Sequence, residues 1–360
     1  MNSNTSRTAS PVRVLIVDDS AVMRDLLSSV LSEDPEIQVV DTAPDPYVAR
    51  EKIKAFNPDV ITLDVEMPHM DGVTFLRKIM TLRPMPVVMI STLTTAGAET
   101  TLEALEIGAV DFVAKPTANV ATTLAQLAPE ICAKVKNAGR TKVRAPVVRK
   151  PKVQTLNRSA ASGDKIVFIG ASTGGVEALK VVLLGMPADS PPVLITQHMP
   201  PRFTLAFAER LNRECAMTIS EARHGEPVEQ GHAYIAPGSH HLEIAKVGGR
   251  YICQLNDGPL MSGHRPSVDV LFQSAAKLVG KNAVAAILTG MGKDGANGMR
   301  EMRNAGAYTI GQDEASSLIY GMPRVAFEVG GVMKQVPLGD VSDAILAACH
   351  YVPASQTKSA

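Results

Sequence analysis

Three short segments beyond residue 165 carry residues that could perform nucleophilic catalysis. The first is GASTG at residues 170–174, which places Ser172 between an apolar run and a helix-like segment. This spacing matches the G-x-S-x-G nucleophile elbow, a sharp strand-to-helix turn that exposes the serine oxygen. A glycine-rich turn before a helix can also bind a phosphate, although this one lacks the Walker lysine. On this motif alone, a hydrolase, a nucleotide site and a simple tight turn remain open.

The other two segments supply a base and an acid. His198 lies in TQHMP after the next apolar run, and Asp294 lies in LTGMGKDG after a later one. Either residue alone is usually an ordinary loop residue or a helix N-cap. With Ser172 they supply a nucleophile, a general base and an orienting carboxylate from three predicted strand ends. The order Ser, His, Asp differs from the Ser, acid, His order of α/β-hydrolases, so we do not expect that fold.

An acidic cluster with a lysine is predicted near the N-terminus. Asp18 and Asp19 follow the first apolar run, Asp64 ends the third, and Lys115 follows the fifth. The carboxyl ends of strands in a doubly wound sheet meet at one edge, where ligands bind. Three carboxylates there call for a hard divalent cation such as Mg²⁺. A carboxylate beside Mg²⁺ and a lysine can attack a phosphoryl group, so we expect an aspartyl phosphate on Asp64.

The elements that position this cluster are predicted from hydrophobic periodicity. Apolar runs alternate with helix-period segments five times between Val12 and about Lys136, which predicts a parallel sheet covered by helices on both faces. The expected strands span residues 12–17, 37–42, 60–63, 86–90 and 110–113. The first helix carries apolar residues in a stripe that would face such a sheet, namely Val22, Leu26, Leu27, Val30 and Leu31.

A second α/β domain is predicted after a linker. Residues 137–163 are basic, contain proline and show no periodicity, as in an exposed linker. Beyond it we expect strands at 166–170, 193–196 and 283–288 and helices at 175–184, 202–213, 267–279, from about 294 and near 339–349. Glycine-broken segments between 231 and 257 predict an antiparallel hairpin insertion. The expected organisation is a tail at 1–10, a first doubly wound domain at 11–136, the linker, a doubly wound catalytic domain at 164–352 and a tail at 353–360.

Composition excludes several classes of protein. Lys plus Arg and Asp plus Glu are both 36, so no net charge draws the chain to nucleic acid or an anionic membrane. The apolar runs are far shorter than the roughly 20 residues of a membrane span, and the first ten residues lack the apolar segment of a secretory signal. We therefore expect a cytoplasmic protein. Four scattered cysteines predict neither disulfides nor a structural metal.

The N-terminal motifs resemble the response-regulator receiver family. They are VDDS at 17–20, LDVEMP at 63–68, DG at 71–72, Ser91, and AKP at 114–116. The resemblance implies that Asp64 is the phosphoacceptor and that a histidine kinase is the phosphodonor. It also implies Mg²⁺ ligands from Asp18, Asp19, Asp64 and the Glu66 carbonyl, and switch residues Ser91, Lys115 and Phe112. A cis bond between Lys115 and Pro116 is implied as well.

The motifs GASTGG, TQHMPP and LTGMGKDG resemble the catalytic domain of the chemotaxis protein-glutamate methylesterases. This resemblance implies a catalytic triad of Ser172, His198 and Asp294, with backbone amides of Thr173 and Met291 in the oxyanion hole. It implies hydrolysis of glutamate methyl esters on methyl-accepting chemoreceptors, and deamidation of receptor glutamines, without a cofactor in the hydrolase. We expect the receiver to inhibit the hydrolase until Asp64 is phosphorylated.

Two other functions remain open for this domain pair. A receiver joined to a DNA-binding output is disfavoured by the neutral charge and by the lack of a helix-turn-helix pattern. A catalytically silent adaptor is compatible with the sequence. Five further histidines are interpreted as loop residues, namely His224, His232, His240, His241 and His264. Arg202 and Arg265 are candidates for contacts with an acidic receptor surface.

Overall fold

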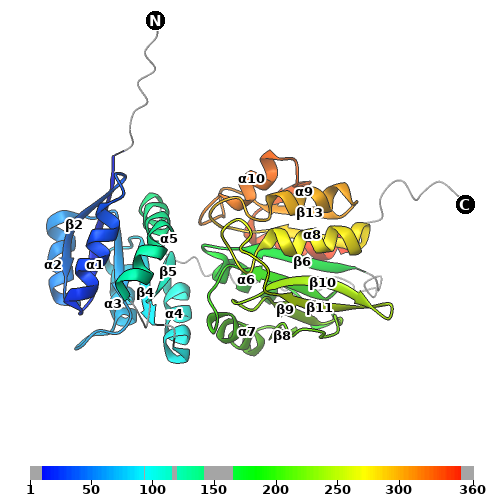
Figure 1. Cartoon of the computed structure of the whole chain (residues 1–360), viewed down its shortest axis with the longest axis horizontal. Coiled ribbons are helices and arrows are strands. Elements are labelled where there is room, and N and C mark those ends of the chain that lie inside the picture. Colours follow the sequence, from blue (N-terminus) through cyan, green and yellow to red (C-terminus); the bar gives the residue numbers. More distant parts are fainter. Residues whose placement is uncertain (1–9, 93, 116–119, 142–164, 350–360) are drawn as a thin grey trace, which may run out of the picture. The chain divides into compact units, whose positions relative to one another are not determined.

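The chain divides into two compact α/β units, Met1–Val147 and Val148–Ala360 (Figure 1). The computed structural model describes residues 10–92, 94–115, 120–141 and 165–349. The two predicted tails lie outside these residues, except for Ser10. Most of the predicted linker and the Lys115–Pro116 bond also lie outside them. Within them, no helix combines the length and the apolar character that crossing a bilayer requires.

The first unit is the parallel five-stranded sheet predicted from the sequence, in the order β2-β1-β3-β4-β5. Its strands are β1 Val12–Val17, β2 Ile37–Ala43, β3 Val60–Asp64, β4 Val87–Thr92 and β5 Asp111–Lys115. Its helices are α1 Ala21–Ser32, α2 Pro46–Phe56, α3 Gly72–Leu82, α4 Thr95–Ile107 and α5 Val120–Arg140. All five residues of β3 are buried, as expected for a central strand covered on both faces.

Side-chain caps start the helices that follow the strands. Ser20 accepts a hydrogen bond from the Met23 amide at the start of α1, and Asp71 accepts one from the Thr74 amide at 2.7 Å at the start of α3. Asp45 caps α2, whose first residue is Pro46. Each cap therefore fixes the point at which the chain turns back along the sheet.

Helix α5 continues to Arg140, four residues past the end that the sequence predicted at Lys136. Ala138 is buried in this last turn, and Arg140 pairs with Glu36. The basic composition of this stretch resembles a linker, but Arg140 forms an ion pair with Glu36 and Ala138 packs on the domain. Tertiary contacts therefore extend the helix beyond the point where periodicity fades.

The second unit contains a seven-stranded parallel sheet in the order β14-β13-β12-β6-β7-β9-β8. Its strands are β6 Ile166–Ala171, β7 Val193–Gln197, β8 Thr218–Glu221, β9 His232–Ile235, β12 Ala283–Ile287, β13 Tyr308–Gln312 and β14 Lys334–Val336. Its helices are α6 Gly175–Leu184, α7 Phe203–Glu214, α8 Val268–Leu278, α9 Ala296–Asn304, α10 Met322–Glu328 and α11 Val341–Cys349. The strands β10 His241–Val247 and β11 Arg250–Asn256 form the expected antiparallel hairpin.

The sequence prediction was wrong about part of the segment 231–257. Strand β9 lies parallel to β7 and β8 in the main sheet, and only β10 and β11 form a hairpin. The strands β8, β13 and β14 and helix α10 were not predicted. These elements span three to seven residues each, which is too short for periodicity to separate a parallel strand from a hairpin strand.

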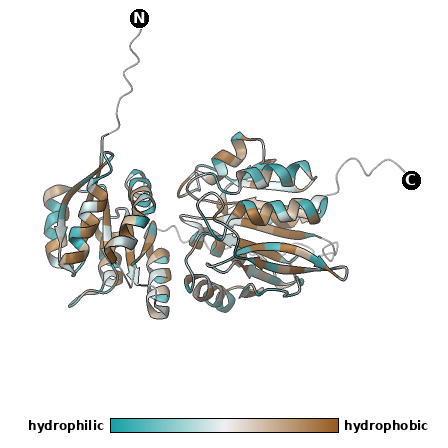
Figure 2. Ribbon diagram, in the orientation of Figure 1, coloured by the Kyte–Doolittle hydropathy of each residue, from teal (hydrophilic) through white to brown (hydrophobic). Residues whose placement is uncertain are grey.

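An apolar core of the second unit lies between its sheet, helices α8 and α9, and the hairpin. It joins buried side chains such as Phe168 of β6, Leu242 of β10, Phe272 of α8 and Met299 of α9. Figure 2 shows hydrophobic residues along the strands and hydrophilic residues on the outer sides of the helices. On the other side, α11 contacts β12 and β13 and packs against α6. Helices α8 and α9 are thus held firmly against the strand ends that carry the site.

The close contact of α8 and α9 yields a stability prediction. A Cβ on Gly298 would lie 2.5 Å from Phe272 Cβ, so Gly298→Ala must push the two helices apart. We expect it to destabilise the domain by about 1–3 kcal/mol, as overpacking does. Gly339→Ala is the control because a Cβ there meets nothing within 4 Å. Thermal unfolding of both variants checks this, and an unchanged midpoint for Gly298→Ala contradicts the packing argument.

Candidate active site

The nucleophile elbow joins β6 to α6. The Ser172 amide donates to the Thr289 carbonyl at 3.1 Å, and the Gly175 amide donates to the Ser172 carbonyl at 2.7 Å. Gly174 has φ 77°, and a Cβ there would lie 2.8 Å from Leu318 Cβ, so this position requires glycine. Ser172 remains partly exposed at the carboxyl end of the sheet. A substrate carbonyl can therefore reach its hydroxyl.

His198 follows β7, the strand that pairs with β6, and lies beside Ser172 as predicted. Its Nδ1 lies 3.2 Å from Ser172 Oγ, and its Nε2 lies 2.8 Å from Asp294 Oδ2. The serine proteases use the opposite ring orientation, with Nε2 toward serine and Nδ1 toward aspartate. A general base needs one ring nitrogen within reach of the serine and the other within reach of the carboxylate, so the imidazole can fill this role in either orientation.

Asp294 lies between β12 and α9 and is buried. Its carboxylate also accepts hydrogen bonds from Ser267 Oγ at 2.8 Å and from the Val268 and Asp269 amides at 2.7 and 3.2 Å. Burial raises the pKa of Asp294, but the hydrogen bonds and His198 outweigh this effect, so the pKa lies below its ordinary value. Asp294 is therefore ionised, and it can hold the His198 ring and stabilise its protonated form.

The residues predicted for the oxyanion hole adjoin Ser172. Thr173 is the next residue in the elbow and is buried. Met291 follows Gly290, where a Cβ would lie only 2.8 Å from Ser172 Cβ. The two segments thus meet at the nucleophile, which agrees with the predicted role of their amides. That role remains a prediction.

Sequence reasoning missed several residues that support the trio. Gln197 Nε2 donates to the carbonyls of Ser172 at 3.0 Å and His198 at 3.1 Å, joining the two motifs. Ser267 was missed because a lone serine before a helix looks like an N-cap. Gln197 stands inside the motif TQHMPP, but nothing in the sequence shows that its side chain reaches the elbow.

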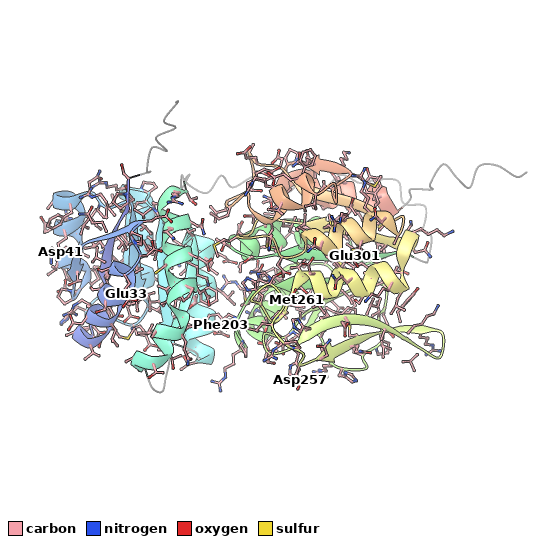
Figure 3. All side chains as sticks on the ribbon, turned by 45° about the horizontal axis from the view of Figure 1, so that its top comes forward. Glu33, Asp41, Phe203, Asp257, Met261 and Glu301 are labelled. Carbon is pink, nitrogen blue, oxygen red and sulfur yellow. The ribbon has the colours of Figure 1, made fainter. Side chains whose placement is uncertain are left out.

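The ring of His264 stacks on the ring of His198, with centroids 3.8 Å apart and planes inclined by 15°. His264 belongs to the loop between β11 and α8, where its backbone exchanges two hydrogen bonds with Met261. Met261 is labelled in Figure 3. Arg265 of the same loop donates to the Asp257 and Gly258 carbonyls, so it shapes the loop. The stacked ring of His264 restricts the rotation of the His198 imidazole.

The interpretation of five other histidines as loop residues was wrong for two of them. His232 lies in β9 and His241 lies in β10. His224, His240 and His264 lie in loops.

The contacts of Gln197 generate a prediction about turnover. Gln197→Glu keeps the shape but removes both donors and sets a carboxylate against two carbonyls, which displaces Ser172 relative to His198. We expect kcat to fall about 10- to 100-fold, the range for displacements near 1 Å. Gln230→Glu is the matched control, because Gln230 also donates to a carbonyl, that of Asp189, away from the trio. Steady-state hydrolysis measures kcat for both variants. Equal kcat values would show that Gln197 does not hold the elbow in place.

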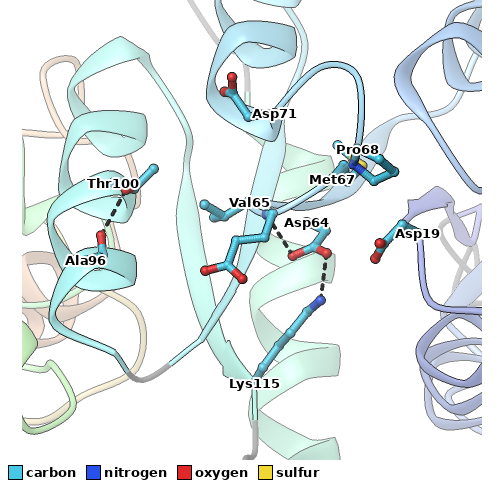
Figure 4. Close-up of a pocket in the computed structure, with 10 residues that line it drawn as sticks. Asp19, Asp64, Val65, Met67, Pro68, Asp71, Ala96, Thr100 and Lys115 are labelled. Atoms are coloured by element: carbon cyan, nitrogen blue, oxygen red, sulfur yellow. Dashed lines mark hydrogen bonds and ion pairs between the residues drawn. The ribbon is translucent and has the colours of Figure 1, made fainter.

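The predicted acidic cluster forms at the carboxyl end of the first sheet (Figure 4). One ligand atom each from Asp18, Asp19 and Asp64 lies within 4.8 Å of the others. Lys115 Nζ lies 2.8 Å from Asp18 Oδ2 and 2.7 Å from Asp64 Oδ2. Burial and the charge of Asp18 raise the pKa of Asp64 to about 6, although Lys115 opposes the shift. Three carboxylates this close suit a hard divalent cation.

The residues predicted as receiver switches lie on β4 and β5, the strands at one side of this sheet. Ser91 is buried, and its hydroxyl accepts a hydrogen bond from Thr101 Oγ1 of α4 at 2.6 Å. Phe112 is buried in β5, where Lys134 Nζ donates to its carbonyl at 2.7 Å. The Glu66 amide lies 3.3 Å from Asp64 Oδ1. Ser91 and Glu66 thus lie at the carboxyl end of the sheet with the acidic cluster, whereas Phe112 lies near the start of β5.

A receiver-type sheet with an acidic pocket, followed by an α/β unit with a Ser–His–Asp arrangement, defines a receiver protein with a hydrolase as its output domain. Comparison with known proteins agrees. The model of the response regulator receiver domain matches residues 14–125, and that of the CheB methylesterase matches residues 167–345.

Full-length relatives share this arrangement. The chain is 54% identical to protein-glutamate methylesterase/protein-glutamine glutaminase 1 of Geobacter metallireducens, over 92% of this chain and 94% of that protein. It is 54% identical to the protein of the same name from Xanthomonas campestris pv. campestris, over 94% and 97%. The crystal structure of the Thermotoga maritima CheB methylesterase catalytic domain matches with a TM-score of 0.50 and 35% identity, covering 51% of this chain and 97% of that one. The chain belongs to the CheB methylesterase family, which confirms the resemblance seen in the sequence.

Proposed function

We propose that this protein hydrolyses γ-methyl esters of glutamate side chains on chemoreceptors and converts receptor glutamines to glutamates. The observation that carries the proposal is the Ser172–His198–Asp294 arrangement, with distances of 3.2 and 2.8 Å between successive partners. Relatives at 54% identity are named for both activities. Receptor adaptation in chemotaxis is the process that such an activity serves.

The reaction follows from the geometry of the trio. Ser172 Oγ attacks the γ-carbonyl carbon while His198 Nδ1 takes its proton, and Asp294 stabilises the imidazolium. The Thr173 and Met291 amides donate to the oxygen that becomes negative. His198 returns the proton to the leaving methoxide, methanol departs, and an ester of Ser172 remains. Water activated by His198 then splits this ester and frees the glutamate carboxylate.

The same steps serve a glutamine side chain. An amide differs from the ester only in its leaving group, so the protonated His198 gives its proton to the departing nitrogen and ammonia leaves. The acyl-enzyme and its hydrolysis are then identical. The hydrolytic domain carries out both reactions with its own side chains and without a cofactor.

The receiver unit supplies the regulation. Asp64 accepts a phosphoryl group from the histidine kinase of the pathway, and Asp18, Asp19, Asp64 and the Glu66 carbonyl hold Mg²⁺. When bound, Mg²⁺ neutralises charge on the carboxylates and the phosphoryl oxygens. Lys115 and the Ser91 hydroxyl bind the phosphorylated side chain, with Phe112 as the aromatic switch residue. For Ser91 this requires leaving Thr101 of α4. The protein acts in the cytoplasm, on receptors, without inserting into the membrane or binding nucleic acid.

Substitutions in the trio test the hydrolase. Ser172→Ala removes the nucleophile, so methanol release from methylated receptor membranes should fall to background. Asp294→Asn should retain the fold but lower turnover by orders of magnitude, since the corresponding change in a serine protease costs about 10⁴. Methanol release and circular dichroism measure the two effects. Near-normal turnover of folded Asp294→Asn would remove Asp294 from the triad.

A serine-directed probe separates the enzyme from a silent adaptor. A fluorophosphonate should label Ser172 in the wild type and leave Ser172→Ala unlabelled. Absence of labelling in the wild-type protein favours the adaptor.

Asp64→Asn tests the receiver. The wild type should acquire acid-stable but base-labile phosphate from acetyl phosphate in the presence of Mg²⁺, and its methanol release should rise. Asp64→Asn should show neither effect, because it lacks the attacking carboxylate, and chelation of Mg²⁺ should abolish both in the wild type. Stimulation of Asp64→Asn by acetyl phosphate would contradict the assignment.

A further inference from the structure

A buried polar chain extends from Asp294 away from Ser172. Ser267 Oγ donates to Asp294 Oδ1 at 2.8 Å, and the Ser267 amide donates to His241 Nδ1 at 3.2 Å. At the far end, His241 Nε2 lies 3.0 Å from the Pro259 carbonyl oxygen. Asp294 and His241 are each 2% exposed, and Ser267 is fully buried. This series of hydrogen bonds therefore connects His241, the first residue of strand β10, to Asp294 through buried groups only.

The two partners of His241 determine its protonation. A carbonyl oxygen only accepts, so Nε2 carries a hydrogen, and a backbone amide only donates, so Nδ1 carries none. Both ring nitrogens of His241 are thus engaged, and the ring is held in one orientation. A second proton on Nδ1 would face the Ser267 N–H. The imidazole serves here as a rigid bridge of fixed length between two backbone segments.

The position of Ser267 determines where the first amides of α8 point. Ser267 stands at the N-cap of α8 but makes no side-chain cap, because its hydroxyl is turned toward Asp294. Asp294 takes over the cap and accepts from the Val268 and Asp269 amides. All three of its donors outside the trio therefore come from residues 267–269. A shift of this segment moves every one of them together.

The start of α8 has little room to shift on its other sides. A Cβ on Gly295 would lie 2.5 Å from Val268 Cγ1, and one on Gly170 would also collide with this methyl group. Asp269 Oδ1 accepts from the Gly298 amide at 2.7 Å, so α8 in turn caps α9. Close packing holds Val268 and Asp269, whereas the Ser267 amide is held by His241. A single substitution of His241 can thus remove the bond to the Ser267 amide without disturbing the packing around Val268 and Asp269.

We propose that His241 is a positioning residue for the triad, acting through Ser267 on Asp294. The inference rests on the proposed hydrolase function. Loss of the His241–Ser267 bond lets Ser267 move, which weakens the hydrogen bond from its hydroxyl to Asp294 and misaligns His198 with Ser172. Because His241 contacts neither His198 nor Ser172 by any bond in the described chain, its removal acts on turnover and leaves substrate binding unchanged.

The experiment compares two substitutions of His241 in the full-length protein. Asn places its Oδ1 near the position of Nδ1 and so restores an acceptor for the Ser267 amide, whereas Leu restores none. We expect His241→Leu to lower kcat about 10- to 100-fold with KM within about twofold of the wild type. His241→Asn should keep kcat within about threefold. Combining His241→Leu with Ser267→Ala should cost less than the product of the two separate losses, since both act on one path.

His232→Leu is the matched control. His232 is a partly buried histidine of β9, bound to Ser220 Oγ at 2.8 Å and stacked on Tyr234, with no bond to the polar chain in the described part of the protein. It should lower the thermal midpoint but leave kcat unchanged. Unchanged kcat in His241→Leu, or equal kcat in His241→Asn and His241→Leu, overturns the inference.

Labelling of Ser172 by a fluorophosphonate supplies a readout that does not depend on the receptor substrate. Its rate should fall in His241→Leu and recover in His241→Asn. A wild type that is labelled but releases neither methanol nor ammonia refutes the proposed function alone. Equal labelling of the wild type and His241→Leu refutes the positioning role alone.

Discussion

The second domain depends on keeping one ionised carboxylate out of water. An unpaired buried carboxylate is costly, and the usual outcome is that it takes up a proton. Asp294 stays ionised because it accepts hydrogen bonds from Ser267, from two amides of α8 and from His198. The fold must therefore bring the start of α8, the end of β12 and the end of β7 to one point. The packing of α8 on α9, and the glycines that allow it, serve this requirement.

The two domains solve the same problem of gathered charge in different ways. In the first, Asp18 and Asp64 face Lys115, and the pKa of Asp64 is raised to about 6 by burial and by Asp18. In the second, neutral donors surround Asp294, and its pKa is lowered. The first arrangement retains room for further charge, such as a cation or a phosphoryl group. The second is satisfied by the protein alone, as suits a group that orients a histidine.

The site residues at strand ends could be predicted from the sequence, but the residues that hydrogen-bond to them or hold them in place could not. Ser172, His198 and Asp294 each follow an apolar run, and parallel strands bring such positions together whatever the loops do. Gln197 and His241 bind backbone groups, which have no sequence signature, and Ser267 binds Asp294, which lies 27 residues away in the sequence. Short elements were missed for a related reason: β9 spans only four residues, and its pairing with β7 is decided by the sheet around it. The end of α5 depends on Glu36, which is distant in sequence.

The capping of α8 by Asp294 has a consequence for the evolution of this domain. Catalytic groups commonly strain the fold that carries them, so that their replacement raises stability at the expense of activity. Here the proposed catalytic acid, Asp294, also caps α8, and within the described part of the chain Ser267 makes no such cap. Selection for stability and selection for turnover therefore favour the same carboxylate. A descendant that lost the chemistry would still have reason to keep an acidic residue at this position.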